Sequence, residues 1–335
     1  MAITDSLDSA TTEVLALVTA INAERAALLS HYLALTGGTM TGALTLAGDP
    51  TAALQAATKE YVDAQKALVI ASTVQTISAT TFYVNSFTGS DSNNGLTPTT
   101  AFATIQACVN YVSQFYCAGT VTVNIAAGTY TSSAQSVVFV SQSLIAAWNF
   151  VGAGVSTIID GSGTGKIAFN INVGVTATLT GVLCKAYYYC ISSWGELFLG
   201  TVTCQLTNAA TSTGLYTNEN GIIFNVGGAT WTFTGTGNSC GSSTNGGSIS
   251  AGYHDAYSSR SLTIVYTSCV ANYNFTAIMH ATFSLDPTMI TWSGAPTGGI
   301  RYSVTLNSYV QVWGAGSTLI PGAGAGTVDA TSTYA

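Results

Sequence analysis

Short apolar bursts, separated by Gly, Ser, Thr and Asn, recur throughout the second half of the chain. They return at intervals of roughly 20–30 residues, which is the signature of structural units stacked along one axis. No uninterrupted apolar run reaches the ~18 residues that a membrane-spanning helix needs. The sequence therefore predicts an all-β fold of stacked coils, without membrane insertion. The bursts are residues 167–171, 176–183, 195–202, 221–226, 230–234, 261–266, 289–292 and 302–306.

Charged residues are scarce and unevenly distributed. The 335 residues include 7 Lys and Arg and 14 Asp and Glu, and ten of these 21 charges lie within residues 1–66. This change in charge density predicts a boundary between two kinds of surface near residue 66. The net charge of −7 argues against a nucleic-acid partner, because phosphate binding needs clustered Lys and Arg. Asp5 and Asp8 lie where a secretory leader would carry positive charge, so no leader is expected.

Residues 3–35 carry a seven-residue apolar repeat of the kind that forms coiled coils. An isolated helix of this length needs a partner to persist in water, so we expect a short bundle of several chains. Glu24 and His31 occupy two positions of the seam and weaken its second half. A single amphipathic helix on a globular core would show the same stripe and is the alternative. The expected seam, which supplies the trimerisation residues, consists of Leu7, Val14, Leu17, Ile21, Leu28 and Leu35.

The segment after this helix, residues 37–63, reads GGTMTGALTLAGDPTAALQAATKEYVD. It resembles the short repeat in the shafts of bacteriophage tail fibres, in which a glycine-rich turn leads through a short strand into a helix that begins at ATK-x-YVD. The resemblance implies a structural segment in which three chains wrap around one axis. The matching residues are Gly37, Gly38, Met40, Thr41, Gly42, Leu44, Leu46, Ala57, Thr58, Lys59, Tyr61, Val62 and Asp63.

From Phe82 the sequence resembles the entry of right-handed parallel β-helices of the pectate-lyase-like type, which are common in phage tailspikes. The similarity lies in an extended Y-V-N strand, the turn DSNNG at 91–95, an amphipathic helix, and a V-x-V-x-I-x-A-G-x-Y strand at 121–130. The helix is expected at Ala101–Ser113, where its apolar face would cover the open end of the stacked coils. That face consists of Phe102, Ile105, Cys108, Val109 and Val112.

The last segment resembles the C-termini of phage fibre proteins, with a G-x-R-Y strand from Gly299, a P-G turn at Pro321 and a small-residue tail that ends in Tyr334. Together these resemblances predict five parts of the chain. They are an N-terminal helix for virion attachment and trimerisation at 1–36, a shaft repeat at 37–66, a linker at 67–80, a parallel β-helix that binds the receptor at 81–312, and a C-terminal tail at 313–335.

The seven cysteines show neither a CxxC pair nor a spacing typical of zinc sites. Free buried Cys behaves as a small hydrophobic residue, so structural thiols are expected. Disulfides that form later, on an extracellular particle, are the alternative. Cys184 and Cys204 are 20 residues apart and are expected to stack in adjacent coils. No cluster of Asp and Glu suits Ca²⁺, so neither a metal nor another cofactor is expected.

Carboxylates that could cleave a glycan are few. Glycoside hydrolysis needs two carboxyl groups about 5–10 Å apart. Glu196, Glu219 and Asp255 remain as the candidate acid–base group once the acids in predicted turns and in the tail are set aside. His254 precedes Asp255, but adjacent residues on a strand point to opposite faces. We therefore expect no catalysis, with a depolymerase that uses these three carboxylates as the alternative.

Aromatic and amide side chains are dense in the middle of the chain, for example at 187–189 and at Trp194. Aromatic rings pack against the C–H face of sugars, while amides and hydroxyls bind sugar hydroxyl groups. Stacking of the same rings inside the coils or between chains is the alternative for each residue. The expected glycan-binding residues are Tyr216, Asn218, Trp231, Tyr253 and Tyr257.

These observations predict a homotrimeric phage tail fibre or tailspike, a structural protein of the virion that adheres to a glycan on the host surface. It would be assembled in the host cytoplasm and would contact other tail, baseplate or capsid proteins through its N-terminus. A polysaccharide-depolymerising tailspike, acting as a glycosidase or a lyase, is one alternative. A capsid head fibre or collar whisker with a structural role alone is the other.

Overall fold

The computed structural model describes residues 3–31, 46, 48–51, 56–73, 75–141, 143–252 and 260–335. The chain divides into two compact units, Met1–Ala71 and Ser72–Ala335. In the first unit, helix α1 (Ile3–His31) confirms the expected N-terminal helix as far as residue 31, and residues 32–35 lie outside the described part. No helix among the described residues is both long and apolar enough to cross a membrane.

Helix α2 (Lys59–Thr73) begins where the shaft-repeat resemblance places a helix start. Thr58 caps it, because the Thr58 Oγ1 accepts a hydrogen bond from the backbone N–H of Tyr61 at 3.0 Å. Lys59 forms an ion pair with Asp63 one turn further along. Since α2 continues to Thr73, the expected linker at 67–80 is helical from 67 to 73.

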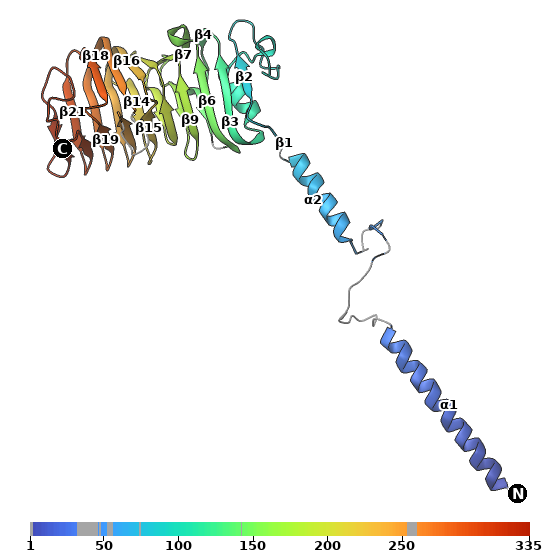
Figure 1. Ribbon diagram of the computed structural model, residues 1–335. Coiled ribbons are helices and arrows are strands. Elements are labelled where there is room, and N and C mark those ends of the chain that lie inside the picture. The colour runs from blue at the N-terminus through green and yellow to red at the C-terminus, as the bar shows by residue number, and fades with distance from the viewer. Residues whose placement is uncertain are drawn as a thin grey trace. The chain divides into compact units, whose positions relative to one another are not determined.

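The second unit is predominantly β, and every strand pairing described in it is parallel. Its strands form two sheets, which Figure 1 shows extending from β2 to the C-terminus. The first sheet consists of β1 (Gln75–Thr76), β2 (Thr81–Val84), β3 (Phe115–Ile125), β6 (Ile145–Gly152), β9 (Thr176–Thr180), β12 (Glu196–Leu199), β15 (Ile222–Asn225), β17 (Ser248–Ala251), β19 (Thr282–Leu285), β22 (Tyr309–Gln311) and β24 (Thr333–Tyr334).

The second sheet has more strands because the chain usually crosses it with two segments in each repeat. It consists of β4 (Gly128–Tyr130), β5 (Ser136–Val140), β7 (Thr157–Gly161), β8 (Ile167–Ile171), β10 (Val182–Ala186), β11 (Tyr189–Ser193), β13 (Val202–Leu206), β14 (Thr213–Thr217), β16 (Ala229–Thr244), β18 (Leu262–Ile278), β20 (Ile290–Ser293), β21 (Ile300–Thr305) and β23 (Thr327–Val328). Two short 3₁₀ helices, Pro98–Thr100 and Gly154–Ser156, lie in the connections.

The order of pairing shows a structural repeat of three strands. β10 pairs with β13, β11 pairs with β14, and β12 pairs with β15, so each strand lies beside its counterpart in the next repeat. Cys184 is in register with Cys204, which confirms that these residues stack one repeat apart. This arrangement is compatible with a parallel β-helix.

The core of the second unit is built from columns of side chains that the parallel register places on top of one another. One column, called here the inner ladder, follows the first sheet, and each of its residues is at most 1% exposed. Its stacking is continuous because the neighbouring strands share one register. The inner ladder consists of Trp148, Ala177, Leu197, Ile223, Ile249, Phe283 and Val310.

Helix α3 (Ile105–Val112) packs against β2, β3 and β5 and buries Ile105, Cys108, Val109 and Val112. The sequence placed this helix at 101–113, but its first four residues are not helical. The carboxylate of Asp91 accepts hydrogen bonds from the backbone N–H groups of residues 103 and 104, at 2.9 and 2.8 Å. These bonds hold the approach to the helix in an extended form, and Thr104 becomes the N-cap. Phe102 lies before the helix but is still buried, and its backbone forms an isolated parallel β-bridge with Val84.

All seven cysteines are buried. Burial raises the pKa of the Cys184 and Cys204 thiols well above the usual range, so both stay protonated at neutral pH. Cys240 and Cys269 lie with their sulfur atoms 3.7 Å apart. A protonated and enclosed thiol is a poor nucleophile, since the thiolate is the reactive form.

We therefore expect the native protein to react slowly with a thiol reagent such as 5,5′-dithiobis(2-nitrobenzoate). All seven thiols should react once guanidinium chloride unfolds the chain. Raising the pH to 9 should accelerate the reaction of Cys184 and Cys204 in the native protein little, because their raised pKa keeps both thiols protonated. Rapid labelling of Cys184 and Cys204 in the native protein would contradict their stacking inside the core.

Candidate functional site

Two of the expected glycan-binding residues, Tyr216 and Asn218, lie close together at the end of β14. The Tyr216 ring stacks on the Tyr189 ring, with centroids 3.9 Å apart and planes 4° apart. The Tyr216 hydroxyl shares a 2.9 Å hydrogen bond with the Thr244 hydroxyl, which donates to Asn218 Oδ1 at 3.1 Å. Asn245 Nδ2 donates to the same oxygen at 2.8 Å. One face of the Tyr216 ring and the polar atoms of this network are therefore already engaged within the chain.

Trp231 was expected to bind a glycan, but it is buried in the core. It is 1% exposed, and its backbone is in register with Val202 on one side and Ile264 on the other. Alternation along β16 turns Trp231 and Phe233 into the core and the intervening threonine outward. Trp231 is therefore a core residue, as the alternative interpretation held. Tyr253 and Tyr257 lie outside the described residues.

Of the three candidate carboxylates, two belong to described residues and one does not. Glu196 is exposed at the start of β12, where its Oε2 accepts a hydrogen bond from the Thr176 hydroxyl at 3.4 Å. Glu219 lies in the turn before β15 with a φ of 49°, and Ile222 of β15 is in register with Glu196. Asp255 lies outside the described residues. No group of three or more His, Cys, Asp or Glu side chains suited to a metal ion occurs in the described part of the chain.

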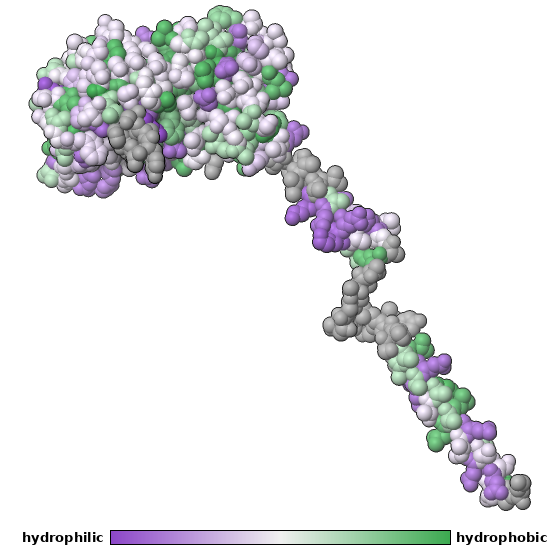
Figure 2. All heavy atoms as spheres, in the orientation of Figure 1, coloured by the Kyte–Doolittle hydropathy of each residue, from purple (hydrophilic) through white to green (hydrophobic). Residues whose placement is uncertain are grey.

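The expected trimerisation residues are exposed along α1 in the single chain. Their exposed fractions are 66% for Leu7, 60% for Val14, 61% for Leu17, 53% for Ile21 and 55% for Leu28. Figure 2 shows apolar side chains at the surface of this helix. Leu35 lies outside the described residues.

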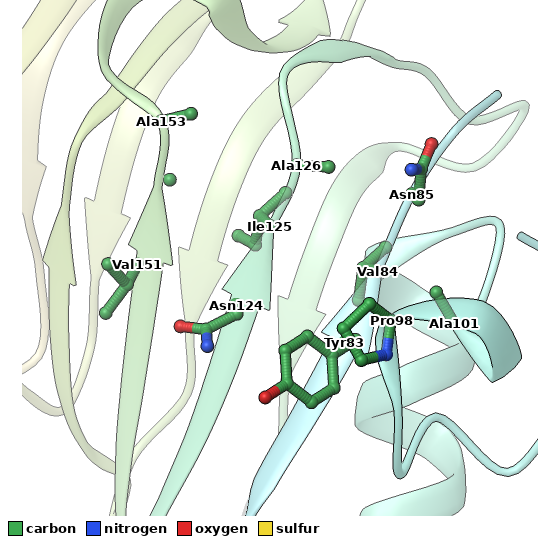
Figure 3. Close-up of a pocket in the computed structure, with 11 residues that line it drawn as sticks. Tyr83, Val84, Asn85, Pro98, Ala101, Asn124, Ile125, Ala126, Val151 and Ala153 are labelled. Atoms are coloured by element: carbon green, nitrogen blue, oxygen red, sulfur yellow. The ribbon is translucent and has the colours of Figure 1, made fainter. Parts of the chain in front are cut away.

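Among the hollows on the described surface of the second unit, two are compared here as candidate ligand sites. The smaller, with a volume of about 280 Å³, lies where β2, β3 and β6 end. Tyr83, Asn124 and Val151 are in register across these three strands, and Figure 3 shows Pro98 beside the Tyr83 ring. The Asn85 amide at its edge is engaged, because Asn85 Oδ1 accepts hydrogen bonds from the backbone of residues 87 and 88. Its lining is mostly small and apolar.

The larger hollow, called here the α3–β8 groove, has a volume of about 520 Å³. Four separate segments form it, namely α3, β5 with the residues before it, β8, and the turn after β11. It combines two aromatic rings with three side-chain amides. Its lining consists of Gln106, Ala134, Gln135, Ser136, Phe139, Ile167, Asn170 and Trp194.

The sequence pointed to Trp194 as part of an aromatic-rich region but did not connect it with the other residues of this groove. Phe139 and Asn170 lie in strands whose sequence carries no binding motif. Gln106 lies on a helix for which the sequence indicated only an apolar, core-facing side. Their proximity arises from the strand register, which pairs Phe139 with Asn170 and Asn170 with Ser192. No local motif encodes that pairing.

Comparisons of the chain with protein-family models, with curated proteins and with solved structures find no match. The class that the structure defines is a predominantly β protein with parallel pairing, preceded in the chain by a long helix.

The burial of Trp231 in the core predicts that this residue contributes strongly to stability. Removing a buried Trp side chain costs about 3–5 kcal/mol, so Trp231→Ala should strongly lower the free energy of unfolding. Trp313→Ala is the matched control, because Trp313 is 63% exposed and its loss should change stability little. Urea denaturation of both variants measures the difference. Equal stability of the two variants would contradict the placement of Trp231 in the core.

Proposed function

We propose that this protein is a homotrimeric bacteriophage fibre or spike that binds a glycan on the host surface. We also propose that residues 81–312 form a right-handed parallel β-helix. The observation that carries the proposal is the exposed apolar seam of α1, followed in the chain by a unit of parallel strands. The shaft-like segment at 37–63 supports the same assignment, and so does the capped start of α2.

The β-helix proposal is supported by the three-strand repeat and by the columns of buried apolar residues. In such a fold each coil contributes one strand to each sheet face, and stacking neighbours bury one continuous core. The inner ladder has this property, as does the pairing of Cys184 with Cys204. Right-handedness is the expected sense, because crossover connections between parallel strands are nearly always right-handed.

The trimer proposal is supported by the amount of apolar surface on α1. Five seam side chains are each more than half exposed in the single chain. Burying a Val, Leu or Ile side chain contributes about 1.5–3 kcal/mol, and an isolated helix is marginal in water. Two further copies of the same helix would cover the seam with side chains of matching spacing. The shaft resemblance implies three chains.

The adhesion proposal is supported by the surface chemistry of the second unit. Partly exposed polar side chains occupy corresponding positions on β3, β6 and β9, at Thr122, Asn149 and Thr178. The same row is polar again on β19 and β22, at Ser284 and Gln311. Between these two stretches, β12 and β15 contribute Phe198 and Phe224 to the row. Figure 2 shows that the visible face of this unit is mostly weakly polar. Hydroxyl and amide groups recognise sugar hydroxyls, and a repeating surface suits a repeating polysaccharide.

Assembly is tested at the seam. Ile21→Asp would place three carboxylates in a buried trimer seam, where an unpaired charge is strongly unfavourable. We expect the 34.3 kDa chain to change from trimer to monomer, measured by light scattering after size-exclusion chromatography. Ala26→Asp is the control, because it adds the same charge five residues along, on the opposite side of the helix. An Ile21→Asp protein that remains trimeric would show that α1 does not drive assembly.

Adhesion and catalysis are distinguished with labelled full-length protein and host cells. Periodate oxidation of the cell surface destroys vicinal diols of sugars, so binding should be lost after this treatment. Glu196→Gln and Glu219→Gln should leave binding unchanged, because these substitutions remove only the acid–base function.

The same variants test the depolymerase alternative. Wild-type protein incubated with host capsular polysaccharide or lipopolysaccharide should release no reducing ends or unsaturated sugars. Release that disappears in Glu196→Gln, Glu219→Gln or Asp255→Asn, while binding persists, would replace the adhesin assignment with a glycan-cleaving one.

A further inference from the structure

We propose that the α3–β8 groove is the saccharide-binding site, and that it accepts an uncharged hexose or N-acetylhexosamine unit. This inference rests on the proposed adhesion to a glycan and gives that function a location. The location differs from the expected one, because the groove lies at the α3 end of the second sheet rather than around Tyr216 and Trp231.

The groove offers two aromatic rings at its surface. Phe139 is 37% exposed, and Trp194 is half-buried. Both line the same groove, although they come from β5 and from the turn after β11. A ring of this kind provides a flat apolar face for the C–H groups of a pyranose at low entropic cost.

The position of Phe139 is held by helix α3. The backbone N–H of Phe139 donates to Gln106 Oε1 at 2.7 Å, and Gln106 Nε2 donates to the Phe139 carbonyl oxygen at 3.1 Å. Gln106 Nε2 also donates to Asn110 Oδ1 at 2.8 Å, which fixes the amide on the helix. The backbone that carries the Phe139 ring is therefore held in place before a ligand binds, which lowers the ordering cost of binding.

The polar groups beside Phe139 are not engaged within the described part of the chain. Asn170 is in register with Phe139, and its Oδ1 is buried without a hydrogen-bond partner there. Ser192 is next in register, and its Oγ is also buried and unpartnered among those residues. Leaving such an atom unsatisfied costs about 1–3 kcal/mol. A sugar hydroxyl both donates and accepts, so it satisfies an amide in either orientation.

Polar side chains further along the same row of paired residues, in contrast, are hydrogen-bonded within the chain. The Tyr216 hydroxyl is paired with Thr244, and the Thr276 hydroxyl donates to Ser242 Oγ at 2.7 Å. Among the described members of this row, the buried polar atoms without a partner are Asn170 Oδ1 and Ser192 Oγ. Of the two, Asn170 lines the groove directly.

The charge of the groove selects the class of sugar. None of its lining residues carries a charge, and the chain has a net charge of −7. A uronic or sialic acid would lose hydration without gaining a cationic partner. An uncharged unit avoids this cost of desolvating an ionised carboxylate. Ile167 and Ala134 add apolar contact area of the kind that suits an N-acetyl methyl group.

The test uses the full chain labelled with 5-fluorotryptophan, observed by ¹⁹F NMR. The protein has five Trp residues, and the resonance that is lost in Trp194→Phe identifies Trp194. The probes are methyl glucoside, methyl galactoside, methyl mannoside, N-acetylglucosamine and N-acetylgalactosamine, with glucuronate and N-acetylneuraminate as charged comparisons. We expect at least one uncharged sugar to shift the Trp194 resonance, and the charged sugars to bind about tenfold more weakly or not at all.

Variants then assign the binding to this groove. Phe139→Ala and Asn170→Ala should each raise the dissociation constant about tenfold, with circular dichroism and the denaturation midpoint unchanged for Phe139→Ala. Phe87→Ala is the matched control, because Phe87 is 80% exposed and does not line the groove, so its loss should not affect binding.

Two outcomes overturn the location while leaving adhesion intact. One is sugar binding, seen by calorimetry, that neither shifts the Trp194 resonance nor weakens in both variants. The other is glycan-dependent binding to host cells that both variants retain in full. Preferential binding of glucuronate or N-acetylneuraminate would overturn the assignment to uncharged sugars. Failure of every sugar to bind overturns the groove as a saccharide site, and binding of the protein to purified host capsular polysaccharide or lipopolysaccharide decides separately whether the protein binds a glycan at all.

Discussion

The parallel register of the second unit is the constraint on which the rest of its structure depends. Each strand lies beside its counterpart one repeat later, so a residue that points inward on one strand has an inward-pointing residue above and below it. Leu197, Ile223, Ile249 and Phe283 follow one another in this way and are all 0% exposed. A slip by one residue would turn such a column outward, which makes the register strongly specified.

The same register also determines which polar groups beside the groove have no partner among the described residues. It places Phe139, Asn170 and Ser192 side by side, and α3 then fixes Phe139 through the Gln106 amide. Around Tyr216, by contrast, hydroxyl and amide groups bond to one another. Recognition needs rigid apolar faces together with unpaired polar atoms, and these two properties coincide in the α3–β8 groove.

Helix α1 depends on a different source of stability. Its backbone hydrogen bonds are internal, but its apolar seam is exposed in the single chain, so its persistence in water depends on covering that seam. In the proposed trimer, burial of Val14, Ile21 and Leu28 against their copies supplies this stabilisation. The proposed assembly through α1 and the proposed recognition in the groove therefore depend on separate residues and should respond to separate substitutions.

Patterns that repeat along the chain determined much of this protein. The seven-residue repeat predicted α1, the spacing of 20 residues predicted the stacking of Cys184 on Cys204, and the recurring apolar bursts predicted a predominantly β structure. These predictions succeed because burial of one face imposes a period on the sequence itself. The start of α3 was misplaced, because the Asp91 carboxylate that holds residues 103 and 104 lies more than ten positions earlier.

Tertiary structure alone decided which aromatic residues are buried and which face a hollow. Trp231 and Phe139 both lie on strands of the second sheet, yet Trp231 is enclosed in the core while Phe139 lines a groove. Which side of its strand a residue occupies decides this, and pairing with strand residues about 30 positions away in the sequence sets that side. The groove likewise joins four segments that no local pattern connects, so only the fold brings its aromatic rings and its unpaired amide together.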